Sequence, residues 1–124
     1  MRLRTAPRSV ALTMIALAAL TAFSASAGPS KGDAAAGKKI FVVKCVACHK
    51  PDGSGGIKLT GNPTPSWRDA KRMRDPRYND DYLRDCIVNG KLKSGMVAWG
   101  KTGQLRPADI ENLIAFIHTF APLK

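Results

Sequence analysis

The sequence is poor in cysteine, in acidic residues and in strand-forming patterns. Only three cysteines occur among 124 residues, too few for a disulfide scaffold, so their spacing matters more than their number. No segment shows the alternation of apolar and polar residues that predicts a strand of useful length, and no internal repeat occurs. Nine acidic residues stand against 20 lysines and arginines, a formal net charge of +11. The length limits the chain to one domain.

An uncharged apolar run lies near the N-terminus, and it is short for a membrane span. The run covers residues 10–23, and three arginines precede it. The small residues Ala25-Ser26-Ala27 follow it in the pattern that signal peptidase cuts. We therefore expect residues 1–27 to be a cleaved secretory signal peptide, with residues 28–124 exported to the periplasm and free of any membrane span. The alternative is a retained N-terminal anchor. No cysteine follows the run, which argues against a lipid anchor.

Helix signals dominate the remainder, so we expect an all-α fold. Asp33 is a candidate N-cap for a helix that runs into Cys45, and Asn79 is a candidate N-cap for a second helix that ends before Gly90. Pro107 suits the first position of a third helix, which Pro122 would terminate.

Irregular segments separate these helices. Residues 50–66 hold seven glycines and prolines, too many helix and strand breakers for a regular element. Residues 67–77 are basic and predict a short helical turn, and residues 91–103 predict a second irregular loop.

The chemistry is carried by Cys45-Val46-Ala47-Cys48-His49, the C-x-x-C-H pattern of covalent haem attachment. Two thiols three positions apart on one helical turn can each add to a vinyl group of a single porphyrin, and the following histidine then lies under the iron as a ligand. A thioredoxin-like redox pair would need a βαβ context, which is missing, and a zinc site would need a second ligand pair. The remaining alternative is a chance match.

The chain from residue 28 onward resembles a class I c-type cytochrome over nearly its whole length. Residues 32–41 before the haem motif resemble that family's N-terminal helix, and residues 113–117 resemble its C-terminal helix. The resemblance implies three or more helices wrapped around one covalently attached haem, with the first and last helices crossing. It places Gly37, Phe41 and Phe116 at that crossing, where glycine lets the two backbones approach closely.

The resemblance also implies a methionine as the second axial ligand of the iron. Met96 lies in a loop between the two later helices, as the family's methionine does, although Val97 stands where proline is usual. A histidine and methionine pair favours Fe(II) and raises the reduction potential. We expect Met73, which sits among charges, to lie on the surface and His118 to be a partly exposed structural residue.

Five further residues are candidates for the haem environment. The Ile57 carbonyl takes the place of the family's proline carbonyl, which accepts a hydrogen bond from the histidine ligand. Leu59 would pack on the haem face. Trp67, Arg68 and Trp99 could bond or screen the haem propionates, or could equally be core filling or solvated charge. Cys86 is left without a partner and is expected on the buried face of its helix as an inert small residue.

The distribution of basic residues indicates which kind of partner protein the chain would bind. Basic residues cluster before the second helix and flank the Met96 loop at Lys91, Lys93 and Lys101. A positive rim around an exposed haem edge would steer the protein to an acidic redox partner, and solubility is the alternative explanation.

Nucleic-acid binding does not fit an exported haem protein. We expect a non-enzymatic single-electron carrier that acts as a monomer. The alternative is the haem subunit of a periplasmic oxidoreductase, such as a dehydrogenase or a sulfur-oxidising complex. A haem catalyst or gas sensor needs an open sixth position, which Met96 would fill.

Overall fold

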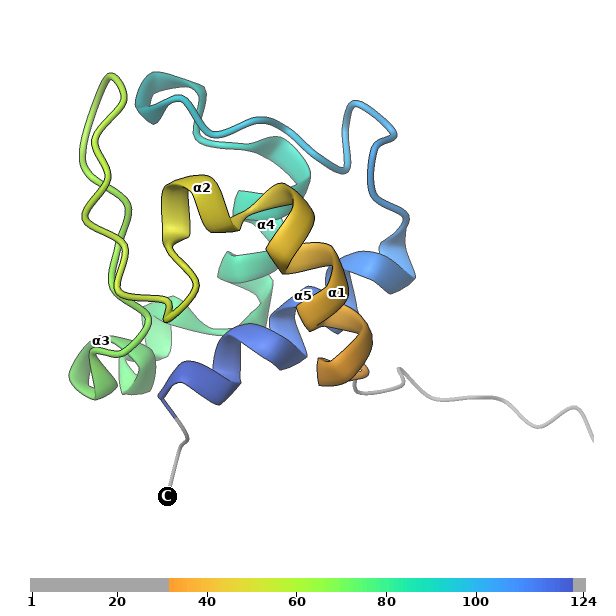
Figure 1. Ribbon diagram of the computed structural model, residues 1–124, viewed down its shortest axis with the longest axis horizontal. Coiled ribbons are helices and arrows are strands. Elements are labelled where there is room, and N and C mark those ends of the chain that lie inside the picture. The colour runs from red at the N-terminus through yellow and green to blue at the C-terminus, as the bar shows by residue number, and fades with distance from the viewer. Residues whose placement is uncertain (1–31, 122–124) are drawn as a thin grey trace, which may run out of the picture.

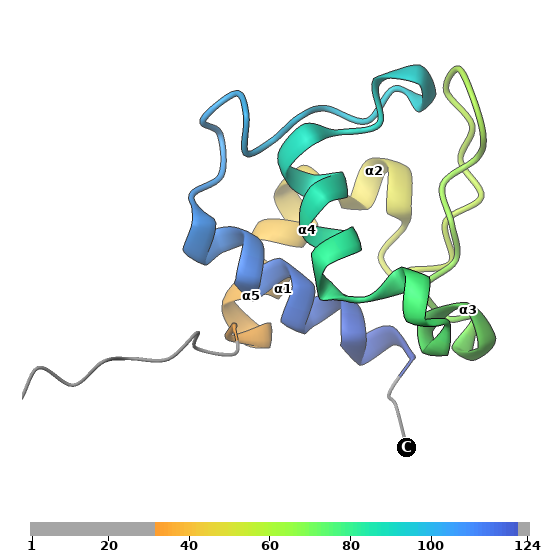
Figure 2. The same cartoon turned by 180° about the vertical axis from the view of Figure 1, so that it is seen from behind.

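The computed structural model describes residues 32–121, and the expected signal peptide and Pro122 lie outside this range. Figures 1 and 2 show a small group of helices joined by long loops. The α-helices are α1 (Ala34–Lys44), α2 (Val46–His49), α3 (Ala70–Arg74), α4 (Asp80–Asn89) and α5 (Pro107–Ile117). The 3₁₀ turns are η1 (Pro76–Tyr78), η2 (Leu92–Ser94) and η3 (His118–Phe120).

The expected all-α fold is confirmed. Between residues 32 and 121 no strand forms, and β-type pairing is limited to one isolated bridge between Lys91 and Met96. No helix in this range has the length and apolar character needed to cross a membrane.

The helix boundaries follow the capping residues that the sequence offers. The Asp33 carboxylate accepts hydrogen bonds from the amides of Ala35 and Ala36, and the Asn79 side chain accepts one from the amide of Tyr82. These bonds satisfy amides that have no partner within the first turn of a helix. Both predicted starting points are therefore confirmed.

The last helix ends earlier than predicted. α5 begins at Pro107, where a missing N–H costs nothing, but its α-helical hydrogen bonding stops at Ile117. The chain then tightens into the 3₁₀ turn η3, which ends at Phe120. Such a tightened last turn is common at helix ends.

The first and last long helices cross at their expected contact. A Cβ atom on Gly37 would stand 1.9 Å from the carbonyl oxygen of Asn112 on α5, so only glycine fits there. The Phe41 ring is 1% exposed, and its centroid lies 5.2 Å from that of Phe116 and 5.5 Å from that of Phe120. Close backbone approach and packed aromatic rings therefore fix α1 against α5. Figures 1 and 2 show these two helices side by side in both views.

Replacing Gly37 with alanine is expected to destabilise the protein although alanine is the better helix former. The added methyl group must push two backbones apart, and such overpacking costs about 1–3 kcal/mol or more, against about 1 kcal/mol gained from helix propensity. Chemical unfolding followed by circular dichroism measures the difference. Ala35→Ser adds one atom on the exposed face of α1 and should change stability by less than about 0.5 kcal/mol. Equal stability of the two variants would show that the close crossing is relaxed in solution.

Met73 does not lie on the surface, so that prediction is wrong. Its side chain is 3% exposed and belongs to the main buried cluster together with Leu83 and Ile110. α3 is a short turn whose N-cap Asp69 accepts hydrogen bonds from the amides of Lys71 and Arg72. Lys71 and Arg74 stay at the surface of this turn while the Met73 side chain packs inward.

Candidate functional site

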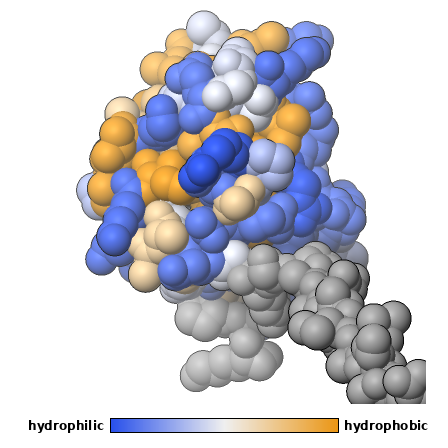
Figure 3. All heavy atoms as spheres, turned by 90° about the vertical axis from the view of Figure 1, so that its right-hand side faces the viewer, coloured by the Kyte–Doolittle hydropathy of each residue, from blue (hydrophilic) through white to orange (hydrophobic). Residues whose placement is uncertain are grey.

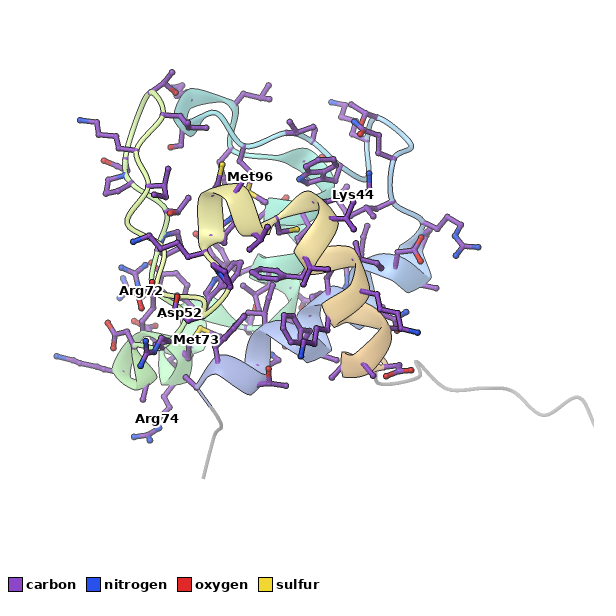
Figure 4. All side chains as sticks on the ribbon, in the orientation of Figure 1. Lys44, Asp52, Arg72, Met73, Arg74 and Met96 are labelled. Carbon is purple, nitrogen blue, oxygen red and sulfur yellow. The ribbon has the colours of Figure 1, made fainter. Side chains whose placement is uncertain are left out.

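The protein contains a cavity of about 640 Å³. That volume lies within the range of about 300–1,000 Å³ that is usual for cofactor and ligand sites. All four residues expected to hold the haem and its iron contribute to the wall: Cys45, Cys48, His49 and Met96. Figure 4 labels Met96, which belongs to the segment between α4 and α5.

The attachment motif is formed by the junction of α1 and α2. Cys45 ends α1 and begins α2, and the amide of His49 donates to the Cys45 carbonyl at 2.9 Å. This turn places both thiols and the imidazole on the wall of one cavity. Lys50 then adopts a φ of 58°, a left-handed conformation unusual for a residue other than glycine, and the helix stops.

Burial changes the protonation of these groups. The pKa of the Cys45 thiol rises to about 11 because burial penalises the charged thiolate. Burial also lowers the pKa of His49 to about 4, so that the imidazole is neutral near pH 7. A neutral imidazole has a free nitrogen lone pair, which is the form that binds a metal.

His49 is held by stacking. The imidazole is 7% exposed and lies parallel to Trp67, with 4.2 Å between the ring centroids. Its Nδ1 atom is buried and has no hydrogen-bond partner among the described residues. Buried polar atoms are rarely left unpaired. Within the described residues, the stacking on Trp67, and no hydrogen bond to Nδ1, orients this imidazole.

The structure brings three of the five predicted environment residues to the cavity. Leu59, Trp67 and Trp99 line its wall, and the Lys44 ammonium lies 5.0 Å from the centre of the Trp99 ring. Ile57 is not part of the wall. Its carbonyl accepts a hydrogen bond from the amide of Thr64 at 2.8 Å, and the expected bond from His49 to that carbonyl does not form.

Arg68 also lies away from the cavity. Its guanidinium pairs with Asp52 at 2.9 Å on the surface, and its side chain is 60% exposed. A carboxylate close by in the preceding loop satisfies this charge locally, so Arg68 is not drawn toward the cavity.

The sequence analysis missed Arg72 as a cavity residue. Arg72 lines the wall, donates to the Tyr78 hydroxyl at 2.8 Å and stacks 4.9 Å from the centre of the Tyr78 ring. Among the described residues it forms no ion pair with a carboxylate. In Figure 4 Arg74, two positions along α3, points away from the protein. Nothing in the run of basic residues distinguishes Arg72 from Arg74 before the chain is folded.

Two further expectations concern Cys86 and His118. Cys86 is half-buried on α4, and it lines the cavity rather than the core. His118 lies outside the cavity, where its Nε2 atom is 2.6 Å from an oxygen of Asp80. This pair ties the end of α5 to the start of α4, a structural role consistent with the expectation for His118.

The Met96 side of the cavity is shaped by a tight turn. The backbones of Lys91 and Met96 exchange two hydrogen bonds of 3.1 Å. Gly90 and Gly95 adopt φ values of 69° and 83°, a region that favours glycine, and a Cβ atom on Gly90 would stand 2.6 Å from the Met96 carbonyl oxygen. These glycines let the chain reverse so that Met96 reaches the cavity wall.

Comparison with known proteins decides the family. Residues 32–117 match the family described as cytochrome C oxidase, cbb3-type, subunit III. Cytochrome c6 of Rippkaea orientalis is 35% identical over 86 residues, which cover 69% of this chain and 69% of that protein. The chain belongs to the c-type cytochromes.

Two other similarities define how far the relation extends. The cbb3-type cytochrome c oxidase subunit FixP of a Bradyrhizobium species is 36% identical over 91 residues, which cover 70% of this cytochrome but 27% of FixP. This cytochrome thus spans about a quarter of that relative. The solved structure of the KustC0563 c-type cytochrome superposes with a TM-score of 0.54 at 22% identity, covering 68% of this chain and 96% of that one. This second similarity shows the fold.

The cofactor of this cytochrome is a covalently bound haem c with its iron. The cavity fits such a group. It offers two thiols at attachment spacing, a neutral imidazole and a thioether, within a mainly apolar wall. A cation, Arg72, is also available to the carboxylates that haem carries.

Proposed function

We propose that this cytochrome is a periplasmic carrier of single electrons. Its haem is attached through Cys45 and Cys48, and its iron is ligated by His49 and Met96. The observation that carries the proposal is that these four side chains, from segments up to 51 positions apart in the sequence, line one cavity. The haem iron supplies the chemistry, since it gains and releases one electron.

The residues of the cavity wall have separate tasks in this proposal. The two thioether links hold the cofactor in a domain too small to retain it by packing alone. His49 binds on one side, and its stacking on Trp67 restricts the imidazole. Met96 binds on the other side and favours Fe(II). Arg72, oriented by Tyr78, offsets the charge of a haem carboxylate.

Ligation by two side chains would distinguish an electron carrier from a haem catalyst. If His49 and Met96 both hold the iron, the chain would leave no open position on it for a substrate or a gas. The protein is therefore proposed to be a carrier rather than an enzyme.

The surface near the Met96 loop suits an acidic redox partner. Lys93 and Lys101 are exposed and form no ion pair among the described residues, whereas Lys91 lies 3.4 Å from Asp85. Beside them Leu92 is 74% exposed. Figure 3 shows, on another face of the molecule, that hydrophobic side chains reach the surface between hydrophilic ones. An apolar contact flanked by lysines would recognise a partner that carries carboxylates around a small apolar patch.

Electron transfer to an acidic redox protein is expected to slow steeply as salt rises. Exposed charges act over roughly 10 Å at 0.1 M salt, so screening weakens the encounter. Replacing Lys91 and Lys93 with glutamate should lower the second-order rate in stopped-flow measurements by roughly tenfold or more at low salt, with little change in potential.

Lys38, on the exposed face of α1, provides the control. Replacing both Lys38 and its exposed neighbour Lys39 with glutamate changes the net charge by the same amount, but on a different element from the Met96 loop. A rate that does not depend on salt, or equal effects at α1 and at the loop, would contradict docking at this surface.

A resident subunit of an oxidoreductase is the second candidate function. It is favoured by the match to subunit III of cbb3-type oxidases and by the similarity to FixP. A subunit would receive its electron inside a complex, so its rate would not follow salt as a diffusing carrier's does. Co-purification of the protein from its native membranes in a defined oxidase or dehydrogenase complex would favour this role over the carrier.

A further inference from the structure

Two loops far apart in sequence meet beside the Met96 turn. The first follows the attachment motif and contributes Leu59, Thr60 and Gly61, and the second contributes Lys93 and Gly95. The Thr60 hydroxyl donates to the Lys93 carbonyl at 2.9 Å, 33 positions further along the chain. Figures 1 and 2 show these loop tips side by side, drawn in green and teal. We call this set of contacts the loop latch.

Glycine makes the latch close-fitting. A Cβ atom on Gly61 would stand 2.6 Å from the Lys93 carbonyl oxygen, so the two backbones nearly touch. A Cβ atom on Gly95 would stand 3.0 Å from Cδ1 of Leu59, so that the leucine covers this glycine. The hydrogen bond of Thr60 therefore lies between two close contacts, one at Gly61 and one at Gly95.

The latch closes one wall of the cavity. Leu59 lines the cavity from the first loop, and Ser94, Gly95 and Met96 line it from the second. On its other side the Met96 turn is tied to Lys91 by two backbone hydrogen bonds. The segment between these attachments, Leu92–Ser94, is one short 3₁₀ turn. Met96 is thus held in place from both sides, by Lys91 within the loop and by Thr60 across the latch.

This second attachment matters because the chain has Val97 after the methionine. Proline there would fix φ and restrict Met96 as well, whereas valine leaves the backbone freer. Val97 is also 40% exposed, so its packing restrains the loop weakly. Because no proline follows Met96, the loop must be held rigid by contacts made in the folded protein.

We propose that Thr60 is a positioning residue for Met96, because its latch to Lys93 keeps the Met96 loop closed over the cavity. Thr60 therefore sets how often the methionine leaves the iron and admits a competing small ligand. The inference rests on the proposed ligation by Met96. It assigns a task to a threonine that does not line the cavity and touches neither haem nor iron.

The test compares Thr60→Val with the wild-type ferric cytochrome. Valine keeps the branched shape and loses the hydroxyl, and losing one neutral hydrogen bond shifts an opening equilibrium by roughly three- to tenfold. Imidazole added as a probe should displace the methionine faster by this factor, read from the loss of the near-infrared sulfur-to-iron band. The amide of Met96, which bonds to Lys91, should exchange hydrogen faster by a similar factor. The reduction potential of the closed form should stay unchanged.

Thr102→Val is the matched control. Thr102 donates its hydroxyl to the Ala98 carbonyl at 2.9 Å within the second loop, so the same chemical change is made without touching the latch. Thr60→Ser keeps the hydroxyl and should restore wild-type behaviour. Urea unfolding of all three variants shows whether any change is local or global.

The outcomes separate the latch from the ligand assignment. Wild-type rates in Thr60→Val, or equal acceleration in Thr102→Val, would overturn the latch. Wild-type ferric protein without the sulfur-to-iron band would instead overturn ligation by Met96. In that case amide exchange at Met96 still reports whether Thr60 holds the loop.

Discussion

A protein in which serine replaces both Cys45 and Cys48 is expected to carry no covalent haem. The thioether links need both sulfurs, and a cavity of about 640 Å³ left without its cofactor removes most of the support for the surrounding helices. The variant should therefore accumulate as a largely unfolded or degraded chain. Mass spectrometry of denatured protein measures the effect, because only a covalent group survives acid-acetone extraction.

The wild-type protein and Cys86→Ser provide the controls. Both should retain the mass of one haem, because Cys86 lines the cavity from α4, outside the attachment turn. The same spectrum should show a chain that begins at Gly28, as expected from cleavage after residue 27. Extraction of the haem from the wild type would refute attachment at these two cysteines. A haem-bearing chain that begins at Met1 would refute cleavage of the signal peptide and leave the haem attachment supported.

Met96→Ala is expected to abolish the near-infrared band of the ferric protein and to lower its reduction potential markedly. Loss of the thioether removes a ligand that favours Fe(II), and water, a weak-field ligand without sulfur, would then take the position. Met96 and Lys91 are paired by two hydrogen bonds between backbone atoms, which the substitution leaves in place. The loop should therefore keep its shape. Absorption spectroscopy and a redox titration of the same sample measure both effects.

Met73→Leu is the matched control for this prediction. Met73 is the other methionine between residues 32 and 121, and its side chain is buried in the main cluster. Leucine conserves its volume, so stability should change by less than about 1.5 kcal/mol and the band should persist. If the band vanished in Met73→Leu and survived in Met96→Ala, the assignment of the axial ligand would be reversed.

The side-chain positions of Met73 and Arg72 could not be predicted from the sequence. Both lie in a run of basic residues, and charge on either side of a methionine ordinarily predicts exposure. In the folded protein one side chain enters the core and its neighbour lines the cavity. Their direction depends on how α3 is set against the rest of the protein, and the N-cap at Asp69 fixes only where this turn begins.

Around His49, too, the structure agrees with one expectation from the sequence and differs from another. Trp67 was expected in the haem environment as a residue that bonds or screens the propionates, and the structure stacks it on the imidazole. Ile57 was expected to orient the histidine, but Thr64 occupies its carbonyl and amide instead. A hydrogen bond between residues seven positions apart in a loop depends on the turn that the loop adopts, and the sequence does not specify this turn.

The sequence by itself determined the haem-attachment pattern, the all-α class and the N-caps Asp33 and Asn79. These features are local: a cap acts on the next few amides, and one helical turn spans the distance between the two cysteines. Only the tertiary structure brought Met96 and His49 to one cavity, brought Arg72 to its wall and joined Thr60 to Lys93. Each of these depends on packing between segments that are distant along the chain, where side-chain direction is decided by what lies opposite.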